Sequence, residues 1–243
     1  ATAVIAVGGR ALLIAVDPDT GEVVWEAPNP NNWKMSHASV LPYTIHGRRM
    51  YVYSAIGGIV GISAETDTRG AVLFESRLWD RNVIAPSPIH VGDGRVFVTA
   101  GYGGGSMMLQ VTPEGDRFSV RALQVQKPDE GLAAEQQTPI FTQGHLFAIM
   151  PKDAGPLRNQ LVCVHPDDFS KVVWSSGKTE RFGLGPFLIA DGMFFILSDD
   201  GVLTLADVST TQYTPITKAR VLEGHDAWGP MAIASGRLVL RDL

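Results

Sequence analysis

The sequence predicts an all-β fold, a β-propeller built from four-stranded antiparallel blades, and three observations lead to this prediction. A pattern of proline, apolar run, glycine and second apolar run occurs four times, with its prolines at Pro88, Pro139, Pro186 and Pro230. Successive prolines are 51, 47 and 44 residues apart, which is the length of a propeller blade. Little of the chain shows the 3.6-residue apolar period of helices. The repeated unit is therefore a β-hairpin.

The first element is a hairpin near the start of the chain. Residues 17–21 read DPDTG, where side-chain oxygens can bond the backbone, proline presets φ and glycine accepts a positive φ. The flanking stretches 12–16 and 23–25 are apolar, rich in β-branched residues and too short for stable helices. We therefore predict two strands joined by a tight turn, with Trp25 on the second strand.

Two further apolar runs follow the later hairpins. The runs 107–111, 161–164 and 202–205 each come after a polar or glycine-rich connection. Together with the hairpin they make four strands per repeat. A radial arrangement of such sheets protects their edges and buries each blade against its neighbours. A fifth copy of the hairpin, residues 38–53, lacks the proline, and we expect its turn to be two residues longer.

These repeats assign residues 1–243 to a single β-propeller domain. The predicted order is a partial blade at 1–28, blades at about 36–80, 85–127, 137–178 and 184–223, and a partial blade at 229–243. The first partial blade has the pattern of strands two to four, and the last has that of strands one and two. Joining them would supply the second strand twice. We therefore expect the chain to be a fragment of a larger propeller.

Large aromatic residues lie on three of the predicted outer strands, at Trp25, Phe74 and Trp174. A ring at this position can pack between two adjacent blades, so we predict that these residues dock one blade against the next. The stretch 15–25, AVDPDTGEVVW, resembles the tryptophan-docking repeat of the PQQ-like repeat family. Residues 163–174 are one residue longer and lack the glycine. The family includes quinoprotein dehydrogenase propellers and the outer-membrane assembly lipoprotein BamB.

Composition excludes several classes of protein. With 45% hydrophobic and 19% charged residues, the chain is too apolar to be disordered, and its apolar runs are too short for a transmembrane segment. A net charge of -5 without a basic stripe argues against nucleic acid as a partner. The single cysteine, Cys163, lies in an apolar run, where we expect it to be buried and without a disulfide. Because the chain opens with Ala1, removal of a leader and secretion stay open.

Loops that enter the innermost strands of a propeller lie at the rim of its central channel, together with the loops that join strands two and three, and the candidates come from the entry loops. Their polar and aromatic side chains are the candidate ligand-binding residues: Trp33, His37, Asn82, Gln136, Gln137, Arg181, His225 and Trp228. The alternative for each of them is a structural role, in which it caps a strand and satisfies backbone groups. The expected partner at this rim is a protein or a small-molecule ligand.

No motif predicts catalytic residues or a metal site. Residues 17–28 begin like a calcium loop but have glycine at the fifth position and proline at the twelfth. The six histidines are dispersed and there is no second cysteine, which argues against zinc. The glycine run 101–106 matches neither the dinucleotide-binding pattern nor the P-loop. Ser36 and His37 are adjacent, so on a strand their side chains would point to opposite faces.

The leading functional hypothesis is a non-catalytic PQQ-like repeat propeller that acts as a binding or assembly scaffold in the bacterial cell envelope, periplasmic or secreted, without a cofactor. The alternative is part of a PQQ-dependent alcohol or sugar dehydrogenase. The resemblance then implies PQQ between a tryptophan and a disulfide of adjacent cysteines, with bound calcium, but this chain has one cysteine. A third hypothesis is a hydrolase or lyase with His37 or His225 as general base, since a histidine can carry protons near neutral pH.

Overall fold

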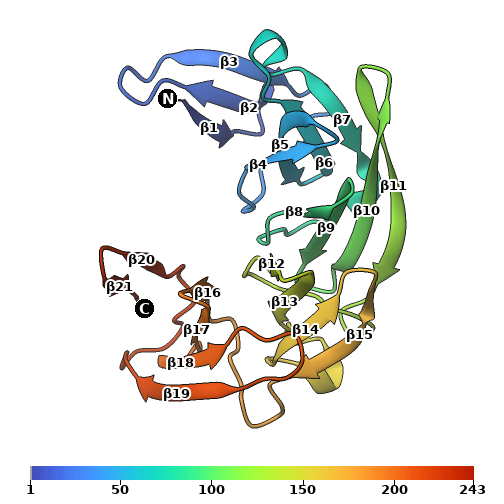
Figure 1. The fold of residues 1–243 in the computed structure, drawn as a ribbon. Coiled ribbons are helices and arrows are strands. Elements are labelled where there is room, and N and C mark those ends of the chain that lie inside the picture. The colour runs from blue at the N-terminus through green and yellow to red at the C-terminus, as the bar shows by residue number, and fades with distance from the viewer. Residues whose placement is uncertain (1) are drawn as a thin grey trace. The chain divides into compact units, whose positions relative to one another are not determined.

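The computed structural model describes residues 2–243, which form antiparallel strands with almost no helix (Figure 1). The helices within these residues are 3-10 turns at Thr66–Thr68, Arg77–Trp79 and Gly155–Leu157, and none has the length or hydropathy of a membrane span. The predicted all-β fold is confirmed. The chain divides into two compact units, the first running up to Ala100 and including Ser106–Val125, and the second formed by Gly101–Gly105 and Gln126–Leu243.

The first unit contains three sheets whose strands are paired in chain order. A three-stranded sheet consists of β1 (Ala3–Ala6), β2 (Ala11–Val16) and β3 (Val23–Pro28). The next sheet has four strands, β4 (Leu41–Ile45), β5 (Arg48–Ala55), β6 (Gly58–Ser63) and β7 (Val72–Ser76). Most of a second four-stranded sheet follows, with β8 (Ile89–Gly92), β9 (Arg95–Ala100), β10 (Gly105–Glu114) and β11 (Arg117–Gln126).

The second unit repeats this plan. One four-stranded sheet contains β12 (Ile140–Thr142), β13 (His145–Ile149), β14 (Leu161–His165) and β15 (Asp168–Ser175). Another contains β16 (Phe187–Ala190), β17 (Met193–Leu197), β18 (Val202–Asp207) and β19 (Pro215–Arg220). A two-stranded sheet of β20 (Ala232–Ala234) and β21 (Arg237–Val239) follows. These four-stranded antiparallel sheets confirm the predicted blade structure.

The repeated glycine of the sequence pattern has the same conformational role in five hairpins. Each hairpin has a two-residue connection in which both residues have positive φ and the second is glycine: His46-Gly47, Asp93-Gly94, Gln143-Gly144, Asp191-Gly192 and Ser235-Gly236. Their φ angles lie between 47° and 76°. Two consecutive residues of this kind make a type I′ turn, whose twist matches that of antiparallel strands. The glycine recurs because this backbone conformation carries no steric cost without a Cβ.

The first of these hairpins corrects one expectation. Its turn was expected to be two residues longer than the others, but β4 begins at Leu41 and ends at the same two-residue turn. The preceding residues are bound elsewhere, since the Ala38 N–H donates to the Ser36 hydroxyl at 3.1 Å and the Ser39 N–H donates to the Ser87 hydroxyl at 2.9 Å. The apolar pattern at 38–40 therefore reflects loop packing, and the expected longer turn is wrong.

Each unit has its own hydrophobic core. In the first unit, β6 is buried along its entire length, and the core around it includes Met50, Tyr53 and Trp79. In the second unit, Phe147, Phe194 and other residues of β13, β14 and β17 form the corresponding core. Strands buried on both faces are expected where sheets pack face to face. The last strands β3 and β19 are largely exposed, in contrast to the buried inner strands.

The three predicted docking aromatics share one local geometry. Each lies on the outermost strand, opposite a small residue of the preceding strand: Trp25 opposite Ala15, Phe74 opposite Gly61, and Trp174 opposite Cys163. In each sheet, the pairing register shifts immediately after the small residue. A shift of this kind bends and twists the strand locally. The small partner leaves room for the ring, as at Gly61, where a Cβ would collide with the Phe74 ring.

Two of these rings contact the next sheet of their own unit. The Trp25 ring stacks on Tyr51 of β5, with 5.8 Å between ring centroids. The Trp174 indole N–H donates to the Ser209 carbonyl at 2.9 Å, and its ring lies 6.0 Å from that of Tyr213. Both partners of Trp174 belong to the segment between β18 and β19.

Candidate binding site

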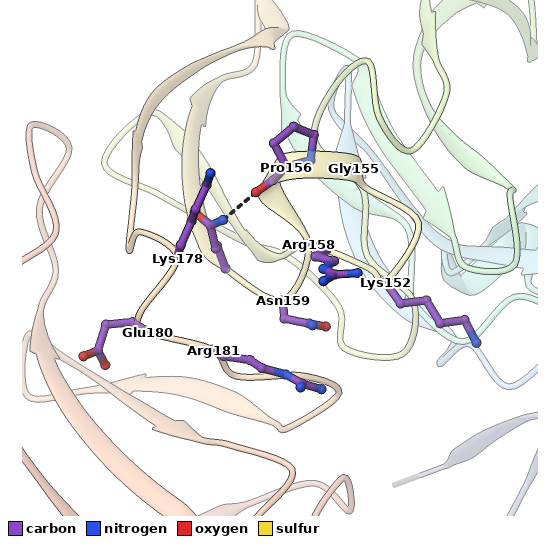
Figure 2. Close-up of a pocket in the computed structure, with 9 residues that line it drawn as sticks. Lys152, Gly155, Pro156, Arg158, Asn159, Lys178, Glu180 and Arg181 are labelled. Atoms are coloured by element: carbon purple, nitrogen blue, oxygen red, sulfur yellow. Dashed lines mark hydrogen bonds between the residues drawn. The ribbon is translucent and has the colours of Figure 1, made fainter.

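Two loops of the second unit leave their sheet at the same edge. Residues 151–160 follow β13, and residues 176–186 follow β15. Neighbouring strands of this sheet are antiparallel, so β13 and β15 run in the same direction and end at the same edge. A pocket of about 610 Å³ lies between these two loops (Figure 2). We call it the loop pocket.

The first loop of the pocket is held by its own hydrogen bonds. The Ala154 N–H donates to the Pro151 carbonyl at 3.1 Å, and the Asn159 N–H donates to the Met150 carbonyl at 2.9 Å. The Gln160 side chain donates to the carbonyl of Pro156 at 2.7 Å, the bond drawn in Figure 2. Because these backbone groups are satisfied within the loop, much of the polar surface that it offers to a ligand consists of side chains.

The two loops are also bonded to each other. The N–H of Phe182 donates to the Asn159 carbonyl at 2.8 Å, and the Phe182 side chain is buried in the core of the unit. The Phe182 carbonyl accepts from the N–H of Asp199 at 3.1 Å. One Asp199 carboxylate oxygen accepts from the Leu184 N–H at 3.2 Å. These contacts fix the backbone that directly follows Arg181.

Cations dominate the lining of the loop pocket. Its charged residues are Lys152, Arg158, Lys178, Glu180 and Arg181, and the four cations are exposed or partly exposed. Figure 2 shows that they come from both loops. The acid, Glu180, lies 3.2 Å from the Lys218 Nζ, which offsets its charge. The loop pocket therefore concentrates positive charge in a chain whose net charge is -5.

The turn Gly101–Gly105 lies beside one end of this lining. Tyr102 is 63% exposed, and the Lys152 Nζ lies 5.3 Å from the centroid of its ring, within the range of a cation–π contact. The Gly103 N–H donates to the Asp153 carboxylate at 2.9 Å, which ties the turn to the first loop. The Lys152 Nζ also lies 3.7 Å from the buried carboxylate of Glu135. An exposed aromatic ring and an anchored cation thus lie next to each other.

The predicted rim residues of the second unit lie in several places. Arg181 lines the loop pocket. The Gln137 side chain donates to the Leu184 carbonyl at 3.3 Å and to the Trp228 carbonyl at 3.1 Å, so it joins two of the predicted loops. Gln136 is partly buried, Trp228 is exposed, and His225 has its Nδ1 2.8 Å from the Asp226 carboxylate.

In the first unit, one predicted rim residue is part of the packing. Trp33 is 4% exposed, and a Cβ at Gly57 or Gly58 would collide with its ring. Its side chain is therefore covered by the chain itself. His37 and Asn82 are exposed, and the His37 N–H donates to the Ile84 carbonyl at 2.9 Å.

The pair Ser36 and His37 is not arranged for nucleophilic chemistry. The Ser36 hydroxyl donates to the Ser54 carbonyl at 2.5 Å and accepts from the Ala38 N–H at 3.1 Å. Ser36 is buried, whereas His37 is exposed. A nucleophile needs a hydrogen bond to its base, and here the hydroxyl proton is directed to a backbone carbonyl.

The residues of the chain do not fit a PQQ–calcium centre. Cys163 is fully buried opposite Trp174, and burial raises the pKa of its thiol to about 12. It therefore cannot stack on a cofactor in the way the resemblance would require. Within residues 2–243, no group of three or more His, Cys, Asp or Glu side chains is arranged to hold a metal ion.

Three cations of the loop pocket, Lys152, Arg158 and Lys178, were not among the predicted rim residues. The candidate residues were taken only from loops that enter an innermost strand, whereas residues 151–160, with Lys152 and Arg158, connect the second and third strands. Lys178 lies in an entry loop, three residues before Arg181, and was not selected. These two kinds of loop lie at the same edge of the sheet. The sequence signal that could have found them is a pair of cations in each loop, Lys152 with Arg158 and Lys178 with Arg181.

Sequential four-stranded antiparallel sheets, each with a type I′ turn between its first two strands, define the class of protein as a β-propeller. Residues 9–127 match the model of a family described as outer membrane protein assembly factor BamB. The predicted resemblance is confirmed over these residues, and the chain has a β-propeller fold similar to that of BamB. No curated protein matches the chain significantly.

Solved structures share this fold. BamB from Moraxella catarrhalis is similar with a TM-score of 0.61 and 13% identity, over 99% of this chain and 66% of that one. The computationally designed Ika8 protein is similar with a TM-score of 0.61 and 11% identity, over 98% of this chain and 64% of that one. The chain thus spans slightly less than two thirds of each of these proteins. At such identities the similarity concerns the fold, and function has to be argued from the site.

Proposed function

We propose that this chain is a non-catalytic PQQ-like repeat propeller, or part of one, that binds a protein partner and acts as an assembly scaffold in the bacterial cell envelope, periplasmic or secreted. The observation that carries the proposal is the loop pocket, whose cations lie on loops held by hydrogen bonds, with the exposed Tyr102 beside it. Exposed arginine and aromatic side chains on a rigid frame are typical of protein-binding surfaces.

The family description supports the same proposal. The matching family is described as an outer membrane protein assembly factor, and its match includes the sheet of β4–β7. A scaffold for assembly has to hold a polypeptide while that polypeptide folds or is handed over. We therefore expect this chain to bind unfolded outer-membrane proteins in preference to folded ones.

The test is binding to a urea-unfolded outer-membrane β-barrel protein after rapid dilution. We expect co-elution with the purified chain in size-exclusion chromatography and slower aggregation of the barrel protein measured by light scattering. An unfolded cytosolic protein of similar length is the matched control. Equal effects on both, or no effect on either, would contradict the proposal.

The same purified chain can distinguish the scaffold function from the alternative dehydrogenase function. Titration with PQQ and calcium, followed by tryptophan fluorescence and by dye reduction with alcohols and sugars, should show neither saturable binding nor turnover. Saturable binding with turnover would replace the proposal by a dehydrogenase function.

A further inference from the structure

We propose that the loop pocket binds an acidic polypeptide segment, an extended stretch of Asp and Glu residues in the partner. This inference rests on the proposed function, since it names the chemistry of the protein partner. The observation behind it is the convergence of Lys152, Arg158, Lys178 and Arg181 from two loops that are hydrogen-bonded to each other.

The positive charge of the loop pocket is not neutralised by acidic residues of its own lining. Glu180 is paired with Lys218, outside the lining, at 3.2 Å. The Glu135 carboxylate lies 3.7 Å from Lys152, and one of its oxygens is buried without a hydrogen-bond partner. Arg158 and Arg181 have no acidic partner among the ion pairs of the described residues. A local excess of cations in an acidic chain selects an anionic partner.

The positive charge of the loop pocket is carried by side chains, and its backbone N–H groups do not form a cradle for an anion. Sites for a compact phosphate often use convergent backbone N–H groups or a helix N-terminus. Here the N–H groups of Ala154, Leu157, Arg158, Asn159 and Gln160 all donate to carbonyls of the same unit. Arginine heads remain available, and their planar fork matches a carboxylate in a bidentate manner.

The size and surroundings of the loop pocket favour a chain over a single ion. A pocket of about 610 Å³ has room for several side chains. Asn159 lies in its lining between the arginine-bearing segments and can bond the backbone of an extended peptide (Figure 2). Tyr102, 63% exposed beside Lys152, extends the surface with an aromatic contact.

The experiment is fluorescence anisotropy of a labelled ten-residue peptide of alternating Asp and Glu, titrated with the full chain at low salt. A peptide of the same length with alternating Asn and Gln is the uncharged control. We expect saturable binding of the acidic peptide, at least tenfold weaker binding of the uncharged peptide, and weakening with added salt. Equal binding of the two peptides would overturn the proposal.

Variants locate the site. Arg158→Gln and Arg181→Gln should each raise Kd about fivefold, and the double variant about 25-fold, as expected for exposed charge pairs of about 1 kcal/mol. Arg121→Gln on β11 removes the same charge from an exposed position outside the loop pocket and should change Kd less than twofold. If the double variant does not fold, Lys152→Gln with Lys178→Gln is the second test. Binding by the folded variants equal to that of Arg121→Gln would overturn the proposal.

Other anions are tested by competition. Inorganic phosphate, tripolyphosphate, single-stranded DNA and phosphatidylglycerol vesicles are added to the preformed peptide complex. We expect each to displace the peptide only at a higher concentration of charge than unlabelled acidic peptide does. Displacement by one of them at a lower concentration of charge would overturn the peptide assignment in favour of that ligand.

The two proposals fail in different ways. If the chain binds unfolded outer-membrane proteins but not the acidic peptide, the pocket assignment is overturned and the scaffold function stands. If it binds the peptide through Arg158 and Arg181 but no unfolded barrel protein, the pocket assignment stands and the scaffold function is overturned.

Discussion

Trp25 and Trp174 occupy the same position in their sheets and are embedded differently. Both lie on an outermost strand opposite a small residue at a register shift. Trp174 is 8% exposed, lies 5.9 Å from the ring of Phe147 and donates to the Ser209 carbonyl. Trp25 is partly exposed, and its ring stacks on that of Tyr51.

The difference shows that the local motif sets the position of the ring and the next sheet sets its burial. The strand pairing places each tryptophan by backbone hydrogen bonds between neighbouring strands. How much of the ring is covered depends on side chains about 25 to 40 residues further along the chain, Tyr51 for Trp25 and Tyr213 for Trp174. The stabilisation supplied by the same motif should therefore differ between the two units.

Trp174→Ala is expected to have the largest effect on stability. It removes a buried ring and leaves the Ser209 carbonyl without its indole donor, so we expect a loss of about 3–5 kcal/mol in the free energy of unfolding. Urea denaturation followed by far-UV circular dichroism measures this loss. Val173→Ala, at an exposed position on the same strand, is the control. A loss no larger than that of the control would show that the ring does not stabilise the unit.

The rate of alkylation of the Cys163 thiol measures local opening of the sheet that carries Trp174. Its thiol is fully buried and its raised pKa, about 12, keeps it protonated, so alkylation at pH 8 requires local opening. Trp174→Ala should accelerate labelling about a hundredfold, the factor that corresponds to about 3 kcal/mol. The expected acceleration in Trp25→Ala is less than tenfold, because Trp25 lies in the other unit. Mass spectrometry of timed samples gives both rates, and equal rates would contradict the comparison.

Trp25→Ala should destabilise the chain less than Trp174→Ala. The partly exposed ring has less area to lose, so we expect about 1–3 kcal/mol in the same urea experiment. Val24→Ala, on the same strand and 50% exposed, serves as the neighbouring control. A loss equal to that of Trp174→Ala would mean that burial by the next sheet does not decide the contribution of this motif.

The smallest expected effect belongs to Asp168, at the start of the strand that carries Trp174. The Ser170 hydroxyl donates to its carboxylate at 2.5 Å and the Lys171 Nζ lies 2.9 Å away, which lowers the pKa of Asp168 to about 2. A folded-state pKa below the unfolded value of about 3.9 stabilises the fold above pH 4, and this contribution is lost as the pH falls toward 2. Because the carboxylate is exposed, solvent screens most of it.

Comparison of Asp168→Asn with the wild type at pH 6 and pH 2 tests this effect. The urea midpoints should differ slightly at pH 6, with the wild type more stable, and converge at pH 2. An undiminished difference at pH 2 would show that the charge of Asp168 does not contribute.

The candidate site was predicted less completely than the fold. Arg181 was identified because it lies in a loop that enters an innermost strand, and the structure places it in the loop pocket. Arg158 and Lys152 were missed because their loop joins β13 to β14, about 25 residues earlier in the chain. Trp33 was expected at the rim, but glycines at 57 and 58 allow its ring to pack against the backbone. Such contacts are set by tertiary packing and leave no local signal in the sequence.

The sequence by itself determined the strands, the hairpins and the class of fold. Turn chemistry and apolar runs act between neighbours in the chain, so the recurring glycines at 94, 144 and 192 mark the hairpins from the sequence alone. Only the tertiary structure decided which loops meet and how deeply each aromatic is buried. The gathering of Arg158 and Arg181 depends on a backbone hydrogen bond between Phe182 and Asn159, a contact that exists only once the sheets have packed.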